Sequence, residues 1–496
     1  MYHPNFADFQ KTSEEANLIP VYREVLADME TPLSAFRKVD AGNYSFLLES
    51  VEGGEKWARY SFLGSNPSLV FKSKGRSAEI IEQGGVERLE VESDPLELMR
   101  SFLQKYSPAR VEGLPRFSGG LVGYMGYDLV HFMETLPHLV DDDLQLPDCL
   151  FMMTDTLLIF DNLTHKIKIV SNAYLRDRDP STLQLAYEEA LHKIDALVSS
   201  LRRPLGASIS PHAWSEEKEM TSNYSQQEFE QAVEAAKGYI QAGDCIQVVL
   251  SQRFRTRLTA HPLDVYRALR VVNPSPYMYY LRMGELKIVG SSPEVMVRLE
   301  GGQIDVRPIA GTRPRGKNER EEIKMAGELL ADPKERAEHI MLVDLARNDV
   351  GRVSEIGSVQ VTELMAIERY SHVMHIVSNV QGQIQAGKDA FDLLRACFPA
   401  GTVSGAPKIR AMEIIEELEP VQRGIYAGAI GYFSFSGNLD TCITIRTIVI
   451  SNGYAYIQAG AGIVADSEPE KEYQETVSKA KAMILALRMA EEGLEA

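Results

Sequence analysis

The chain has few cysteines and no long apolar run. Its 496 residues contain four cysteines and no CxxC pair: Cys149, Cys245, Cys397 and Cys442. Four distant cysteines are too few for a disulfide scaffold, and they suit a reducing compartment. No apolar segment reaches the roughly 18 residues of a membrane span, and the N-terminus has neither the basic nor the apolar region of a signal peptide. We therefore expect a cytoplasmic protein without a membrane partner.

Positive charge is also scarce. Lysine and arginine total 52 against 70 aspartates and glutamates, so the net charge is −18 and the pI is about 5.2. A nucleic-acid-binding protein needs a basic face, and an anionic membrane attracts basic segments, so we expect neither partner. Local cations or a bound metal would have to attract an anionic substrate. The hydrophobic content of 44% is typical of a soluble globular chain and excludes disorder.

The sequence divides near a segment rich in Ser, Pro and Gly, residues 199–223, which is typical of a linker. We therefore divide the chain into residues 1–210 and 211–496. Before the linker, a helix is expected at about 181–201. The glycines of FSGGLVGYMGYD, residues 117–128, do not form GxGxxG at a helix start, so they indicate close strand packing rather than a dinucleotide site. Four further segments are predicted as strands of one antiparallel sheet, at 44–50, 57–64, 68–72 and 78–82.

The second part mixes helices and strands. A helix is predicted over 225–242, with Ser225 and Glu228 as a capping box and Gly243 as its end. We expect other helices at 318–347, broken near Asp332, at about 408–419 and at 470–492, and strands at 245–254, 426–435, 439–450 and 454–459. Because helices and strands do not alternate strictly, this order favours an α+β fold with antiparallel sheets.

Two acidic pairs are candidates for a metal site. Glu335 and Glu338 lie three residues apart, as do Glu472 and Glu475, so each pair lies on one face of its predicted helix. Two such helices facing each other would offer the oxygen ligands that Mg²⁺ prefers. Solvated helix faces are the alternative interpretation.

Two loops are candidates for anion binding. FPAGTVSGAPKIR, residues 398–410, leads into a helix that Ser404 could cap and whose first turn Pro407 suits. Backbone N–H groups at such a start bind carboxylates or phosphates, or the loop is an ordinary helix entry. In RPIAGTRPRG, residues 307–316, Thr312, Arg313 and Arg315 either line an anion site or are simply exposed.

The remaining chemical signals are weak. His372 and His375 form HxxH without the glutamate of a zinc protease, so His375 is either an acid–base group or a core histidine. The chain carries neither a cysteine elbow of the glutaminase type nor a GxSxG motif, so it has no apparatus of its own to hydrolyse glutamine.

Seven ordered segments together resemble the chorismate-utilising enzymes, and most closely their anthranilate synthase branch. They are RPIAGTRPRG, AEHIMLVDLARNDVGRV, RYSHVMHIVSNV, FPAGTVSGAPKIRAMEII, YAGAIGYF, TCITIRT and QAGAGIVADSEPEKEYQET. The resemblance covers about residues 18–490. It implies a large two-part α+β fold of the anthranilate synthase type, with antiparallel sheets packed together, helices outside and interleaved halves.

The resemblance also implies a site. Glu338 and Glu475 would bind Mg²⁺, with Glu335 and Glu472 beside them through waters. The metal, Gly401 and Thr402 would hold the ring carboxylate of chorismate, while Thr312 would line the side from which the nucleophile attacks. The enolpyruvyl carboxylate would be held by Tyr426, Arg446, Gly460 and Gly462. His375 would act as an acid–base group near the departing hydroxyl.

The implied reaction is an amination followed by an elimination. Ammonia adds to C2 while the C4 hydroxyl leaves, and 2-amino-2-deoxyisochorismate then loses pyruvate to give anthranilate. Relatives that add water have a lysine base at the position of Gln247, and aminodeoxychorismate synthases have a lysine nucleophile at the position of Ala310. The residues present favour direct attack by ammonia. An aminodeoxychorismate synthase and a non-catalytic regulator that binds tryptophan or chorismate are the alternatives.

Two partners follow from the resemblance. Ammonia would come from a separate glutamine amidotransferase subunit, so we expect a hetero-oligomer. Tryptophan would bind as a feedback inhibitor of the first step of its own biosynthesis, at the segments LLES and NPSPYMYY. Their candidate contacts are Glu49, Ser50, Pro276, Tyr277 and Met278. Ordinary strand packing is the alternative for these segments.

Overall fold

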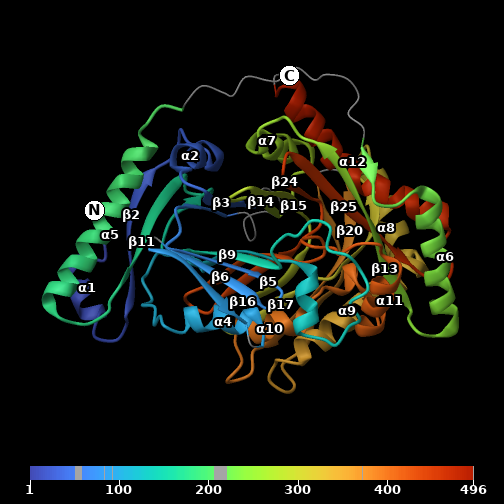
Figure 1. The fold of residues 1–496 in the computed structure, drawn as a ribbon, viewed down its shortest axis with the longest axis horizontal. Helices are drawn as coiled ribbons and strands as arrows, with labels where there is room; N and C mark the ends of the chain where they lie inside the picture. Colours follow the sequence, from blue (N-terminus) through green and yellow to red (C-terminus); the bar gives the residue numbers. More distant parts are fainter. Residues whose placement is uncertain (51–58, 83, 92, 206–219, 371–372, 495–496) are drawn as a thin grey trace.

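The computed structural model describes residues 1–50, 59–82, 84–91, 93–205, 220–370 and 373–494. It contains two large antiparallel sheets packed face to face, with helices on both outer sides (Figure 1). The helices are α1 (Phe6–Thr12), α2 (Pro32–Val39), α4 (Pro95–Leu103), η1 (Tyr127–Phe132), α5 (Pro180–Leu201), α6 (Gln226–Ala242), α7 (Pro262–Val272), α8 (Glu319–Ala331), α9 (Pro333–Gly351), α10 (Ala390–Cys397), η2 (Gly401–Val403), α11 (Lys408–Leu418) and α12 (Pro469–Glu492). The α+β prediction is confirmed.

The first sheet takes strands from both parts of the chain. Its order is β1 (Tyr2–His3), β2 (Leu18–Leu26), β11 (Lys166–Tyr174), β10 (Thr156–Asp161), β4 (Tyr60–Ser65), β3 (Tyr44–Glu49), β14 (Tyr277–Met283), β15 (Leu286–Ser292), β24 (Thr447–Ser451), β25 (Tyr454–Ile463), β13 (Gln247–Arg257) and β12 (Thr221–Ser222), with β21 (Gly405–Ala406) beside β13. The two parts meet where β3 pairs with β14, with Leu47 opposite Tyr280.

The second sheet is interleaved in the same way. Its order is β18 (Ile309–Pro314), β20 (Val373–Gln383), β17 (Gln303–Val306), β16 (Val295–Glu300), β23 (Leu439–Ile443), β22 (Ala429–Ser434), β8 (Gly120–Met125), β9 (Cys149–Thr154), β5 (Leu69–Lys74), β6 (Ser77–Glu82) and β7 (Gly85–Glu90), with β19 (Gln360–Arg369) beside β20. Here the two parts join where β22 pairs with β8.

Apolar side chains point to both faces of each sheet, so the two stacked sheets and the outer helices enclose three apolar layers. On β10, Leu157 and Ile159 face the layer between the sheets, while Leu158 and Phe160 face the helices outside the first sheet. Alternate residues of a strand point to opposite faces of its sheet. The outer layers are covered by α1, α2, α5, α7 and α12 on the first sheet and by α4, α9 and α10 on the second.

Several predicted elements are confirmed. Ser225 and Glu228 form the capping box of α6, and Gly243 ends that helix at a φ of 86°. Asp332 ends α8 and caps α9. Close strand packing at the glycines of β8 is also confirmed, because a Cβ on Gly123 would lie 2.0 Å from a backbone oxygen of Leu150. Most of the predicted linker lies outside the described residues.

Three local predictions are wrong. The four early strands do not form one sheet, because β3 and β4 belong to the first sheet and β5 and β6 to the second. The segment 439–450 is two strands, β23 and β24, in different sheets. Ser404 does not cap α11, since its hydroxyl donates to the carbonyl of Ala400, and Pro407 precedes that helix as its N-cap residue.

Candidate active site

The two acidic pairs meet between α9 and α12. Burial raises the pKa of Glu338, and the negative charges of Glu335 and Glu475 raise it further. Burial and Glu475 likewise raise the pKa of Glu472. Carboxylates that raise one another's pKa hold a proton or a cation more tightly, and oxygen donors of this kind are the ligands that Mg²⁺ takes. The donor set therefore fits a magnesium ion.

Lys479 is a cation of this site that sequence analysis missed. Its Nζ lies 2.7 Å from Oε1 of Glu475, one helical turn away, and donates to the carbonyl of Gly460 at 2.9 Å. The spacing of four residues between Glu475 and Lys479 is a helical ion-pair signal that could have suggested it. The lysine links the acidic pairs to the glycine-rich end of β25.

Arg446 lies where the chain crosses from one sheet to the other. It stands between β23 and β24 with a φ of 52°, a left-handed conformation that is uncommon for arginine. Its Nη1 donates to the carbonyl of Lys479 at 3.1 Å. Burial lowers the pKa of Arg446, while Tyr426 and Glu475 oppose that shift. A half-buried guanidinium of this kind is a strong partner for a carboxylate.

Two glycines of β25 leave room for neighbouring side chains. A Cβ on Gly460 would lie 2.7 Å from the hydroxyl oxygen of Tyr426, and a Cβ on Gly462 would lie 2.3 Å from Nε2 of Gln247. Gln247 is buried, and its Oε1 has no hydrogen-bond partner among the described residues. Tyr426, Gln247 and the backbone of β25 thus line one region beside Lys479 and Arg446.

His375 occupies a position opposite Thr312 in the pairing of β18 with β20. Its Nδ1 lies 2.8 Å from the carbonyl of Gly311 and 3.1 Å from Oγ1 of Thr312. Because a carbonyl only accepts, Nδ1 carries the hydrogen and Nε2 is left as a base. Burial lowers the pKa of His375, and Arg446 lowers it further. His372 lies outside the described residues.

The basic loop is neutralised by carboxylates. Arg313 contacts Glu335 and Asp332, each at 2.9 Å, and Arg315 contacts Glu322 at 2.7 Å. These arginines position α8 and α9 against β18. The structure therefore favours neither of the two alternatives, a free anion site or simple exposure.

Glu294 is a second residue that sequence analysis missed. Its carboxyl lies beside the hydroxyl of Thr402, and burial raises its pKa to about 7, against the smaller opposing effects of Thr402 and Lys479. Glu294, Gly401 and Thr402 line a cavity of about 430 Å³ between β16, α9 and η2. Glu294 follows a proline and has no second acidic residue at helical spacing, so the sequence gives no signal that its carboxyl is withdrawn from solvent.

Comparisons with known proteins show which family the chain belongs to. Residues 45–485 match the family described as chorismate binding enzyme. The chain belongs to this family. It is 51% identical to anthranilate synthase component 1 of Acetivibrio thermocellus, over 99% of this chain and all of that one. It is 52% identical to that of Aquifex aeolicus, over 98% of both. The resemblance found in the motifs is confirmed.

A solved structure supports the same assignment. Anthranilate synthase component I from Streptococcus pneumoniae matches with a TM-score of 0.75 and 37% identity, over 92% of this chain and 98% of that one. The fold and the membership among enzymes that use chorismate are therefore established. Among the described residues of this family member, no helix is both long and apolar enough to cross a membrane.

A second cavity, of about 560 Å³, lies between the two sheets of this chorismate-binding enzyme. The five residues predicted to bind tryptophan line it together: Glu49, Ser50, Pro276, Tyr277 and Met278. The Glu49 carboxylate accepts a hydrogen bond from Tyr266 and lies 3.3 Å from Nε of Arg270. On the facing sheet, Asp440 accepts from Tyr277 at 2.7 Å.

Proposed function

We propose that this chain converts chorismate and ammonia into anthranilate and pyruvate, as the lyase component that begins tryptophan biosynthesis. One observation carries the proposal: the acidic pairs of α9 and α12 lie beside Lys479 and the half-buried Arg446. Chorismate has two carboxylates, so a metal held by the acids could take one while the arginine takes the other. The relatives named anthranilate synthase component 1 support this assignment.

The residues that would bind the metal and the substrate follow from that arrangement. Glu338 and Glu475 would hold Mg²⁺, with Glu335 and Glu472 nearby. When bound, the metal would neutralise the ring carboxylate and withdraw electron density from the ring. Arg446 and Tyr426 would bind the enolpyruvyl carboxylate beside the backbone of Gly460 and Gly462. Gly401, Thr402 and Thr312 would line the ring.

The nucleophile is free ammonia in this proposal. Gln247 cannot deprotonate water as a lysine would, and its amide approaches the backbone of Gly462. Ala310 lies on β18 and carries no nucleophile. Ammonia needs no deprotonation to attack C2, which distinguishes this chain from an aminodeoxychorismate synthase. Exclusion of water from the occupied site would favour ammonia over water as the nucleophile.

The departing C4 hydroxyl needs a proton, and His375 and Glu294 are the two candidate acids. His375 is mainly neutral near pH 7, because burial lowers its pKa. Glu294, with a pKa of about 7, is about half protonated there, and a pKa near the working pH favours proton transfer. We therefore assign the proton donor to Glu294 and keep His375 as a neutral group that orients the ring.

Ammonia would be delivered by a glutamine amidotransferase subunit in a hetero-oligomer, since the relatives are named as one component of an enzyme. We also propose a cytoplasmic location, because a reducing compartment suits the four cysteines, which are free and buried.

Tryptophan would inhibit from the second cavity. The indole would lie among Pro276, Tyr277 and Met278, with Glu49 and Ser50 at the amino group. We expect Glu49→Gln to raise the inhibition constant for tryptophan at least tenfold while kcat stays within twofold. Glu285→Gln, an exposed change, is the control. Unchanged inhibition would place the inhibitor elsewhere.

Turnover by the purified chain tests the main proposal. With chorismate, Mg²⁺ and ammonium at alkaline pH, anthranilate fluorescence and pyruvate should appear in equal amounts and should vanish without Mg²⁺. Consumption of chorismate without pyruvate would favour an aminodeoxychorismate or isochorismate synthase. Tryptophan binding without turnover, even with the amidotransferase and glutamine present, would indicate a regulator.

A further inference from the structure

Three side chains of types that can ligate a metal meet away from the acidic pairs of α9 and α12. Asp128 and His131 lie three residues apart on η1, a 3₁₀-helix, in which such positions lie one above the other. Glu416 comes from α11. One ligand atom from each of the three side chains lies within 4.8 Å of the others. The cluster therefore joins the N-terminal and C-terminal parts of the chain.

Each of the three side chains is buried and has an atom without a partner. The side chains of His131 and Glu416 are 7% and 3% exposed. Among the described residues, hydrogen-bond partners are missing for both ring nitrogens of His131, for Oδ1 of Asp128 and for Oε2 of Glu416. Nε2 of His131 lies 3.3 Å from Oε1 of Glu416. Buried polar atoms are rarely left unpaired, so four in one cluster point to a missing ligand.

The charge of the cluster indicates the kind of ligand. With both carboxylates ionised and the imidazole neutral, it carries two negative charges. Arg423, the cation stacked on the neighbouring Tyr127, is already bound to Glu419 through its Nε at 2.9 Å and its Nη2 at 2.6 Å. A divalent cation would neutralise the cluster and supply a partner for Oδ1 of Asp128, for Oε2 of Glu416 and for one ring nitrogen of His131.

We propose that Asp128, His131 and Glu416 bind a divalent transition-metal ion of the Zn²⁺ type. Imidazole together with carboxylates is a ligand set that Zn²⁺ takes, whereas Mg²⁺ prefers oxygen alone. The site is thus chemically distinct from the acidic pairs, and it does not depend on the proposed reaction.

The ion would hold three segments together. Asp128 already accepts from the N–H of Gly424 through Oδ2 at 2.7 Å, and the N–H of Tyr127 donates to the carbonyl of Gly424 at 2.7 Å. Gly424 lies two residues before Tyr426. Metal binding would therefore fasten η1, α11 and the turn that carries a proposed substrate contact.

Metal uptake by the full chain tests the site. After treatment with a chelator, the chain is saturated with Mg²⁺ and titrated with Zn²⁺ or Co²⁺. We expect one tightly bound Zn²⁺ per chain and, with Co²⁺, visible absorption bands. His131→Gln should weaken the uptake at least tenfold. His138→Gln is the matched control, because this exposed ring stacks on His131 at 4.0 Å without belonging to the ligand set.

Three results would overturn the proposal. They are no uptake of either metal by the wild type, uptake unchanged in His131→Gln, and uptake abolished by Glu338→Gln, which would assign the metal to the acidic pairs. If His131→Gln does not fold, X-ray absorption of the zinc-loaded wild type decides. An imidazole nitrogen shell supports the site, and an all-oxygen shell contradicts it.

Discussion

Glu294 shows how far the fold can change the chemistry of one side chain. Burial beside Thr402 raises its pKa from the ordinary 4.5 to about 7. The same carboxyl in solvent would be ionised and could not donate a proton at neutral pH.

Replacing Glu294 by glutamine keeps the shape of the side chain and removes its titratable proton. We expect kcat to fall by about 10² to 10⁴, the usual contribution of a positioned acid, with little change in the KM for chorismate. Anthranilate formation with ammonium measures this, and Glu285→Gln should keep wild-type activity. A kcat above half that of the wild type would return the role to His375.

The raised pKa of Glu294 also predicts that the stability of the wild type, compared with that of Glu294→Gln, depends on pH. The folded state holds the Glu294 proton more tightly than the unfolded state, so its contribution to stability is lost as the pH rises from about 4.5 to about 7. The stability of the wild type relative to Glu294→Gln should fall by about 3 kcal/mol over this range, without Mg²⁺. Denaturant unfolding at several pH values measures the difference. A constant difference would mean that the carboxyl is not desolvated.

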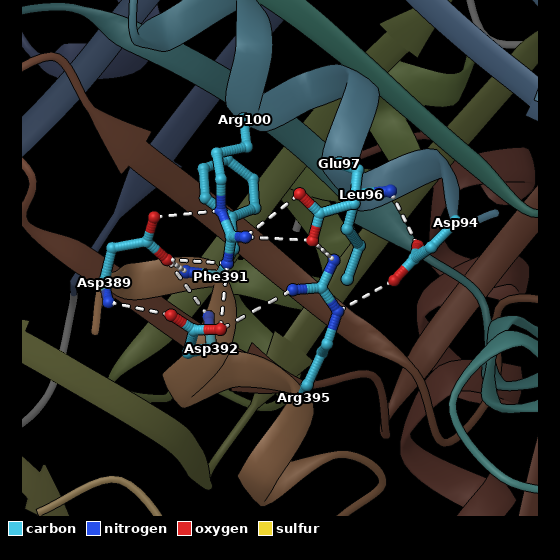
Figure 2. A network of polar contacts seen from close by, with 8 residues as sticks. All are labelled: Asp94, Leu96, Glu97, Arg100, Asp389, Phe391, Asp392 and Arg395. Atoms are coloured by element: carbon cyan, nitrogen blue, oxygen red, sulfur yellow. Dashed lines mark hydrogen bonds and ion pairs between the residues drawn. The ribbon is translucent and has the colours of Figure 1, made fainter. Parts of the chain in front are cut away.

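At the scale of elements, an ionic network fastens α4 to α10 and so joins the two parts of the chain (Figure 2). Arg395 of α10 contacts Asp94 at 2.7 Å and Glu97 at 2.8 Å. Arg100 of α4 contacts Asp389 at 2.9 Å. Only about a fifth of each arginine side chain is exposed, so solvent screens these pairs less than pairs on the surface.

Arg395→Leu should therefore destabilise the protein by about 1 to 3 kcal/mol, because it leaves Asp94 partly buried without its cation. Arg347→Leu is the matched control, since Arg347 and Asp344 form an exposed pair within one helix, worth less than about 0.5 kcal/mol. Denaturant midpoints of both variants compare the effects. Equal shifts would show that the network contributes no more than a surface pair.

At the scale of the whole molecule, the two sheets are shared by both parts of the chain. Separating the parts would expose the edges of β3 and β8 and the apolar layer between the sheets. Unpaired strand edges and exposed apolar faces favour aggregation. The division of the sequence near residue 210 is thus expected to separate two stretches of chain that cannot fold independently.

Expression of the fragments 1–210 and 211–496 tests this expectation. Each alone should be insoluble or should bind a hydrophobic dye and unfold without cooperativity, whereas the full chain unfolds cooperatively. The full chain carrying one cut in the segment 206–219 is the control. A fragment that unfolds cooperatively by itself would show an independent domain.

Much of this protein could be predicted along the chain. Local signals placed the capping box of α6, the break at Asp332 and the two acidic pairs, because capping and helical spacing depend on neighbours in sequence. The ordered motifs indicated the family, which the comparisons confirmed.

The remaining features depend on contacts between distant residues. No pattern in the sequence places β3 and β5 in different sheets, turns the chain at Arg446, or buries Glu294 beside Thr402. No sequence pattern predicts that Asp128 and His131 lie beside Glu416. Sheet pairing and desolvation arise between segments hundreds of residues apart, and for that reason the pKa of a buried carboxyl can be known only once the chain has folded.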